Sequence, residues 1–174
     1  GKFYFECKLD STAGAGCDVV GLTDHEMYDG TDELSQDANS IAYVNDGSVR
    51  KDGSNIDTGE STYTTGDIIG VAMDLDNSKI YFHKNGTYIN SGNPSSSSNG
   101  YSIDAVSTTA TGFYAFAAGD WVGNAGGTYS ANFGNGFFGT TAISSEGTNA
   151  SGIGIFEYDV PTGYTALSTK GLNE

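Results

Sequence analysis

The residues best suited to acid–base or nucleophilic chemistry are two histidines and the many carboxylates of the chain. A hydrolytic triad needs a histidine beside a nucleophile and an acid. His25 lies in an acidic loop, His83 lies on the outward face of a predicted strand, and neither belongs to a G-x-S-x-G motif. We therefore expect both histidines on the surface and a protein that is not an enzyme.

Carboxylates could instead act in pairs, as in glycosidases, or bind a hard cation. No spacing in the chain places two carboxylates opposite each other, and no EF-hand pattern is present, so we expect no metal and no cofactor. The turn at 74–77 is expected to be stabilised by Asx hydrogen bonds. The acidic loop at 24–33 leaves calcium binding open, and a glycosidase remains an alternative.

Trp121 is the strongest candidate for contact with a ligand, because it follows an expected strand at 112–118 and is surrounded by glycines. An exposed indole can line a peptide pocket or stack on a sugar, although it could also fold back as a lid on a sheet edge. Loops at the ends of a rigid scaffold usually carry function. The further candidates on such loops are Asp120, Tyr28, Asp29, Asp32 and Tyr63.

The formal net charge is −15, from 7 basic and 22 acidic residues. Such a surface repels phosphate backbones and anionic lipid, so we expect no nucleic-acid partner and no membrane insertion. Cys7 and Cys17 could face each other if strands at 3–9 and 17–22 form a hairpin, and both a disulfide and two free thiols stay open.

Short alternating apolar segments between Gly, Asn, Asp and Ser clusters predict an all-β chain. The clearest part is 67–89, which predicts three strands joined by turns at 74–78 and at Asn85–Gly86. In its middle strand, Ile80 and Phe82 are expected to face inward. Lys79, Tyr81 and His83 are expected to face outward.

Residues 66–86 read G-D-x-I-G-V-x-x-D-L-D-x-x-x-I-x-F-x-K-N-G, and this pattern resembles the central signature of SPRY domains. The opening G-K-x-Y-F-E at 1–6 and the N-F-G at 132–134 are similar to other strands of that family. The resemblance implies an antiparallel two-sheet β-sandwich of the concanavalin A-like, jelly-roll type that acts as an interaction module. It also implies that Trp121 lines a peptide-binding pocket.

Residues 161–169, P-T-G-Y-T-A-L-S-T, resemble an element that follows SPRY-like domains in bacteriophage structural proteins. We expect one domain over 1–174, with a core at 1–136 and a C-terminal extension at 137–174. Because Gly1 opens directly into strand-like sequence, we expect a piece processed or excised from a longer polypeptide.

Together these features predict a non-catalytic binding and display module on a virion surface. Its partner would be a host-surface glycan or protein, or other virion proteins. An architectural capsid or fibre domain is the alternative, which could form a homo-oligomer through an apolar patch made by Phe137, Phe138, Ile153, Ile155 and Phe156.

Overall fold

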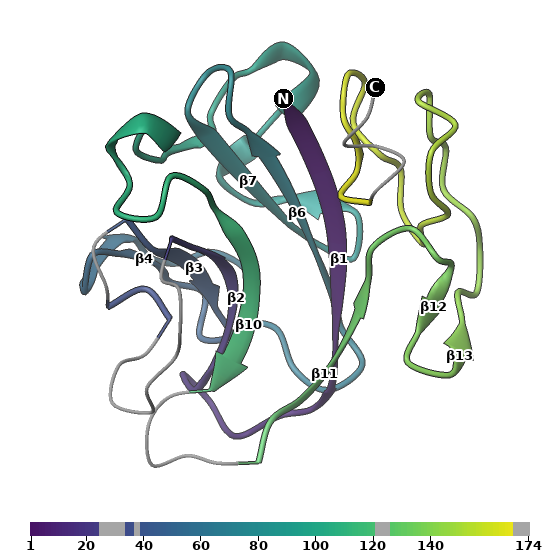
Figure 1. The fold of residues 1–174 in the computed structure, drawn as a ribbon. Coiled ribbons are helices and arrows are strands. Elements are labelled where there is room, and N and C mark those ends of the chain that lie inside the picture. The colour runs from purple at the N-terminus through teal and green to yellow at the C-terminus, as the bar shows by residue number, and fades with distance from the viewer. Residues whose placement is uncertain (25–33, 37–38, 121–125, 169–174) are drawn as a thin grey trace. The chain divides into compact units, whose positions relative to one another are not determined.

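The computed structural model describes residues 1–24, 34–36, 39–120 and 126–168 (Figure 1). Regular structure in these residues consists of strands and three short 3-10 helices, and none of their helices is long and apolar enough to cross a membrane. The chain divides into two compact units. Unit 1 contains the described residues of 1–8, 68–102 and 130–174, and unit 2 contains those of 9–67 and 103–129.

The sheet of unit 1 has the strand order β11-β1-β6-β7-β8, with β9 paired to β7 and β14 paired parallel to β1. Its strands are β1 (Lys2–Ser11), β6 (Ile68–Asp74), β7 (Lys79–Lys84), β8 (Thr87–Tyr88), β9 (Tyr101–Ser102), β11 (Thr128–Asn132) and β14 (Thr165–Ala166). A separate two-stranded sheet is formed by β12 (Phe137–Phe138) and β13 (Thr141–Ala142). The 3-10 helices η1 (Ile89–Ser91) and η2 (Pro94–Ser96) follow β8.

The sheet of unit 2 is antiparallel throughout and has the strand order β10-β2-β3-β4-β5. Its strands are β2 (Asp18–Thr23), β3 (Ile41–Val44), β4 (Val49–Lys51), β5 (Ser54–Asp57) and β10 (Ala115–Asp120). The 3-10 helix η3 (Val106–Thr108) precedes β10. The strand predicted at 112–118 therefore begins later and ends at Asp120, directly before Trp121.

The predicted run of three strands at 67–89 is confirmed as β6, β7 and β8. Asn85 (φ 48°) and Gly86 (φ 84°) both have the left-handed backbone that the tight turn between β7 and β8 requires. In the turn between β6 and β7, the Asp74 carboxylate accepts the backbone N–H groups of Asp76 and Asn77, each at 3.1 Å. These bonds confirm the predicted Asx turn.

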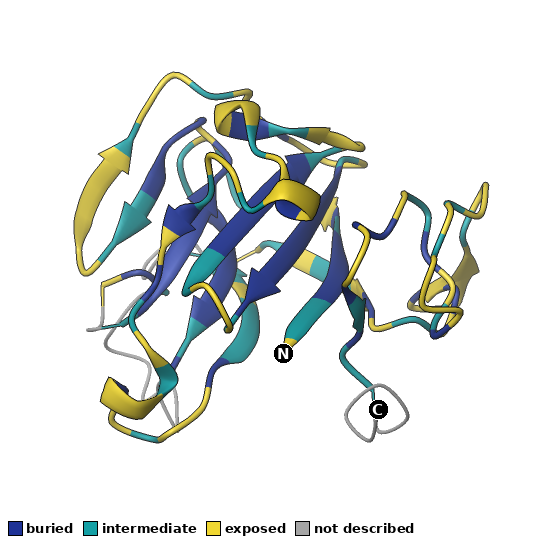
Figure 2. Cartoon of the chain, turned by 90° about the horizontal axis from the view of Figure 1, so that it is seen from above, coloured by how far each residue is buried: buried dark blue, intermediate teal, exposed yellow. Residues whose placement is uncertain are grey.

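The predicted outward face of β7 is wrong, because Tyr81 and His83 are each only 1% exposed. Figure 2 shows the middle of the unit 1 strands as buried. Apolar side chains of the C-terminal segment pack on this face and exclude water from it. The resulting cluster comprises Tyr4, Ala72, Tyr81, Ile153, Phe156, Val160, Tyr164 and Ala166, with Tyr88 at its margin.

His83 also explains the glycine of the I-G-V sequence in β6, since Gly70 lies directly opposite it in the register. A Cβ atom on Gly70 would lie 1.9 Å from Nε2 of the His83 ring. We expect Gly70→Ala to destabilise the protein by about 1–3 kcal/mol, because the ring is enclosed by aromatic neighbours and cannot move freely. Urea unfolding would measure the loss, and an unchanged midpoint would mean that the ring is free to shift.

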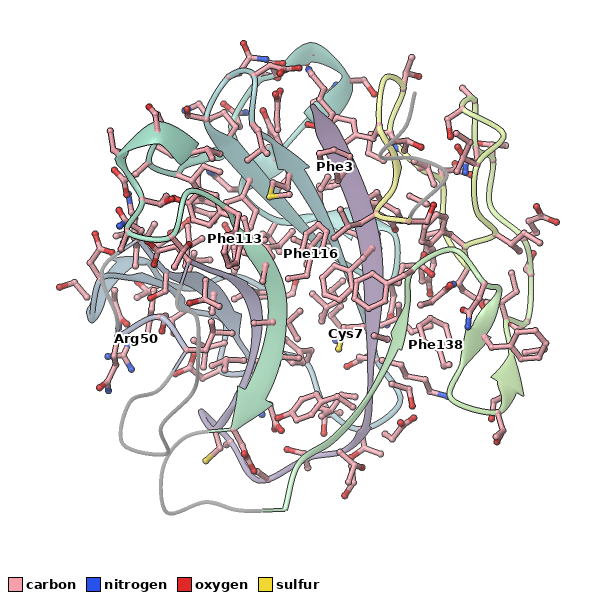
Figure 3. All side chains as sticks on the ribbon, in the orientation of Figure 1. Phe3, Cys7, Arg50, Phe113, Phe116 and Phe138 are labelled. Atoms are coloured by element: carbon pink, nitrogen blue, oxygen red, sulfur yellow. The ribbon has the colours of Figure 1, made fainter. Side chains whose placement is uncertain are left out.

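Strands β1 and β2 do not form the hairpin considered for the two cysteines, since β1 pairs with β6 while β2 pairs with β3 and β10. Cys7 is buried on β1 (Figure 3) and Cys17 is partly exposed before β2. Neither cysteine forms a disulfide bond. The chain continues into a different sheet after 11–17 instead of turning back beside β1.

Candidate functional site

The loop end of the unit 2 sheet is organised around Asp18, the first residue of β2, whose side chain is fully buried. Its Oδ1 accepts hydrogen bonds from the Tyr129 hydroxyl at 2.6 Å and the Ala13 N–H at 3.2 Å. Its Oδ2 accepts from the Thr12 hydroxyl at 2.5 Å and Asn45 Nδ2 at 2.7 Å. We call Thr12, Ala13, Asp18, Asn45 and Tyr129 the Asp18 cluster.

The Asp18 cluster joins three chain segments that are far apart in sequence. No ion pair of the described residues includes Asp18, so hydrogen-bond donors stabilise its carboxylate. The Asp18 carbonyl also accepts the Asn45 N–H at 2.9 Å and the Tyr63 hydroxyl at 2.9 Å. A buried carboxylate is destabilised when it loses such donors, so these hydrogen bonds fix the three segments of the Asp18 cluster against one another.

Asp120, a predicted site residue, belongs to the same loop end, because it pairs with Asp18 across β10 and β2. Its Oδ2 accepts the N–H groups of Gly126 at 3.0 Å and Gly127 at 3.2 Å. A Cβ atom on Gly127 would lie 2.6 Å from the Tyr129 hydroxyl and 2.9 Å from Asp18 Oδ1. Asp120 and Gly127 therefore fix the two ends of the connection that contains Trp121.

Tyr63 also reaches this region, but from the inside rather than as an exposed ligand contact. It is 3% exposed, and its hydroxyl lies 2.9 Å from each of the carbonyl oxygens of Asp18 and Tyr43. Its ring packs on the Tyr43 ring with centroids 5.0 Å apart. The structure therefore places this predicted ligand contact inside the unit, where its single hydroxyl hydrogen can be donated to one of these two buried carbonyl groups.

The remaining predicted contacts, Trp121, Tyr28, Asp29 and Asp32, lie outside the described residues, as does His25. Of the acidic loop at 24–33, only Asp24 is described. Its Oδ2 accepts the Ala110 N–H at 2.9 Å and Asn39 Nδ2 at 3.1 Å. Within the described part of the chain, no three His, Cys, Asp or Glu side chains are grouped for a metal ion.

The apolar patch expected from the C-terminal extension is also corrected. Phe138, Ile153 and Phe156 are buried, and only Phe137 (43% exposed) and Ile155 (44% exposed) remain on the surface. The buried members help to cover the unit 1 sheet, so most of this apolar area is used within the unit.

Unit 1 contains two fully buried carboxylates, that of Asp74, which forms an ion pair with Lys2, and that of Glu6 on β1. Glu6 accepts the backbone N–H groups of Glu157 at 2.9 Å and Tyr158 at 2.8 Å, and Asn132 Nδ2 at 3.3 Å. The Tyr4 hydroxyl donates to its Oε1 at 3.1 Å. Burial raises the pKa of Glu6, and the two backbone donors partly offset that shift. The carboxylate therefore attaches the C-terminal segment to β1.

His83 extends this network through Tyr4. The Gly86 N–H donates to His83 Nδ1 at 3.1 Å, which places the proton of the neutral ring on Nε2. Nε2 lies 2.7 Å from the Tyr4 hydroxyl and can donate to it while that hydroxyl donates to Glu6. Burial lowers the pKa of His83 to about 3. This arrangement gives the histidine a structural role and provides no nucleophile beside it.

The lowered pKa predicts acid sensitivity. The ordinary pKa of histidine is about 6.5, so His83 is protonated below that pH in the unfolded chain but stays neutral in the folded chain down to about pH 3. The free energy of unfolding therefore falls as the pH drops from about 6.5 towards 3. The loss should approach about 1.4 kcal/mol per pH unit below about pH 6. Glu6 acts in the opposite sense: its raised pKa favours the folded state below its ordinary value, and that contribution is lost as pH rises.

His83→Gln isolates the first effect, because Glu6 remains in the variant. Urea unfolding at several pH values should show the difference in stability between the natural protein and His83→Gln shrinking as pH falls from neutral. If the stabilities of the two proteins changed in parallel with pH, the lowered pKa of His83 would not be the cause of the acid sensitivity.

Comparison with protein families gives a match to the SPRY domain over residues 2–118. Comparison with curated proteins gives no match. The match ends before β11 and the C-terminal segment, so the residues that attach that segment to Glu6 lie partly beyond it. Since it covers more than half of the chain, this chain belongs to the SPRY family, whose members are β-sandwich domains and generally non-catalytic protein-binding modules.

Proposed function

We propose that this chain is a non-catalytic recognition module and that its contact surface is formed by the loops around the Asp18 cluster. The observation that carries this proposal is the buried Asp18 carboxylate, which accepts four hydrogen bonds from three separate chain segments. Loops fixed in this way lose little conformational entropy on binding, which favours affinity. Asp120 then sets the start of the connection in which Trp121 lies.

The setting that we propose is a virion surface, with a host-surface protein or glycan as partner. The resemblance of 161–169 to an element of bacteriophage structural proteins supports this setting. Family membership favours a protein over a glycan. The net charge of −15 argues against nucleic acid and anionic lipid.

Binding of the purified domain to arrays of host-surface proteins and of glycans tests the proposal. We expect Trp121→Ala to reduce binding at least tenfold, a typical effect for an aromatic anchor at about 1.4 kcal/mol or more. Phe113→Ala is the matched control, because Phe113 is an exposed aromatic of the same unit. Thermal melting would establish that both variants fold.

Equal binding by Trp121→Ala and the natural protein would contradict the assigned surface. Reducing sugar released from a polysaccharide would overturn the non-catalytic role. Stable trimers with no binding on either array would favour the architectural alternative.

A further inference from the structure

A hollow of about 550 Å³ lies in unit 1 beside the turn between β7 and β8. One side is formed by that turn and the other by the C-terminal segment. The lining residues that matter here are His83, Tyr88, Glu146, Glu157, Tyr158 and Asp159. The second side lies beyond residues 2–118, so the family match does not include this hollow.

The lining contains three carboxylates and neither Lys nor Arg. Two of these carboxylates are held in place by hydrogen bonds from Ser144 and Thr148. Glu157 Oε2 accepts the Ser144 N–H at 2.6 Å, and Asp159 Oδ1 accepts the Thr148 N–H at 2.7 Å and hydroxyl at 2.8 Å. The bonds from Thr148 lower the pKa of Asp159 and so favour its charged form. Each carboxylate retains lone pairs for a further donor.

Tyrosine side chains provide a second, independent feature of the hollow. The Tyr88 hydroxyl is buried and has no hydrogen-bond partner among the described residues. Burial raises the pKa of Tyr88, so this hydroxyl stays neutral. The rings of Tyr88 and Tyr158 pack edge-on to His83, with centroids 5.2 Å and 5.3 Å from it. His83 is uncharged and adds no repulsion to a cation.

We propose that this hollow receives an arginine side chain of a protein partner. A guanidinium group carries five donors, pairs with carboxylates and packs against aromatic faces. The three carboxylates and two tyrosines of the lining supply these partners, and the excess of 22 acidic over 7 basic residues attracts a basic segment to the domain. The inference rests on the proposed protein-binding function but concerns residues of unit 1, whereas the Asp18 cluster belongs to unit 2.

An NMR titration of the nitrogen-15-labelled protein tests this inference. The probes are a capped glycine–arginine–glycine peptide, the same peptide with neutral citrulline in place of arginine, and CaCl₂. We expect the arginine peptide to shift the backbone amide signals of Gly86, Gly147 and Tyr158 at about millimolar concentration. The citrulline peptide should bind about tenfold more weakly, because it lacks the charge.

Glu146→Gln is the informative variant, because Glu146 is exposed in the lining. It should weaken the arginine peptide about two- to fivefold. Glu60→Gln removes the same charge in unit 2 and should leave the affinity unchanged. Equal shifts with citrulline, unchanged affinity in Glu146→Gln, or shifts with CaCl₂ alone would each overturn the proposal. None of these signals depends on Trp121, so failure here is distinguishable from failure of the proposed contact surface.

Discussion

Replacing Glu6 by alanine is expected to destabilise the folded protein by about 3–5 kcal/mol. The substitution leaves the N–H groups of Glu157 and Tyr158 without their acceptor inside the protein, and the Asn132 amide keeps only the Ile155 carbonyl. It also removes the acceptor of the Tyr4 hydroxyl, which contacts His83. Each unsatisfied buried donor costs about 1–3 kcal/mol, so the sum exceeds the effect of any surface change.

Urea unfolding measures this loss, and amide hydrogen exchange at Glu157 and Tyr158 reports whether the C-terminal segment detaches first. Glu6→Gln should destabilise the protein less than Glu6→Ala, because one carbonyl oxygen remains as an acceptor. Some loss is still expected, because the new amide NH₂ group faces hydrogen-bond donors. Glu146→Ala is the surface control and should change stability by less than about 0.5 kcal/mol. A Glu6→Ala protein as stable as this control would show that the segment is held by apolar packing alone.

The middle of the chain could be predicted from sequence because its signals are local. Asn85 and Gly86 need a left-handed backbone, and Asp74 can bond to the next backbone N–H groups whatever the rest of the chain does. Short apolar strands on either side then have to pair. Neither inference depends on a residue far along the chain, and both are confirmed.

The faces of β7 could not be predicted in the same way. Alternation separates Ile80 and Phe82 from Tyr81 and His83, but it does not show that a second apolar layer covers the latter pair. That layer comes from residues 153–166, about seventy residues later in the chain. The sequence of β1 contains an indication of this second layer. Tyr4 and Glu6 share one face of the strand, while Phe5 and Cys7 share the other.

Two of the predicted site residues, Asp120 and Tyr63, lie at the loop end of unit 2, and their role in ligand binding stays a prediction. Asp120 was selected as the neighbour of Trp121, and the structure places it at the start of that connection. Tyr63 was selected as a loop aromatic, yet its hydroxyl allows the ring to be buried against polar backbone groups. Asp18 was missed, because its partners Asn45 and Tyr129 lie far along the chain and no local pattern joins them to it.

Each unit thus contains a fully buried carboxylate that is stabilised by neutral donors. With 7 basic against 22 acidic residues, the chain has few cations to place beside such groups. The buried Asp74 has the ion pair with Lys2, whereas backbone N–H groups, hydroxyls and amides take the place of a cation at Glu6 and Asp18. These neutral groups require precise geometry to satisfy a charge. The same chemistry therefore fixes the C-terminal segment in unit 1 and the loops in unit 2.

Replacing Asp18 by alanine should be as disruptive as the loss of Glu6, at about 3–5 kcal/mol. The side chains of Thr12, Asn45 and Tyr129 lose this shared buried acceptor together. They keep the backbone carbonyls of Gly14 and Gly119 as acceptors, but the loops become independent of one another. Asp18→Asn should lie between alanine and the natural protein, since it keeps the size and one acceptor oxygen. Tyr129→Phe removes a single donor and should cost about 1 kcal/mol.

Urea unfolding ranks these variants, and the backbone amide signals of Gly126 and Gly127 report on the connection that Asp120 holds. If the Asp18 cluster positions this connection, the exchange rates of both amides should rise in the order Tyr129→Phe, Asp18→Asn, Asp18→Ala. Because Asp120 itself is unchanged in all three variants, an effect on its two glycine partners must be transmitted through the cluster. The contrary outcome is that stability falls along the series while the exchange rates of both amides stay low. That outcome would show that the Asp18 carboxylate does not position the loop, and it would contradict the proposed contact surface.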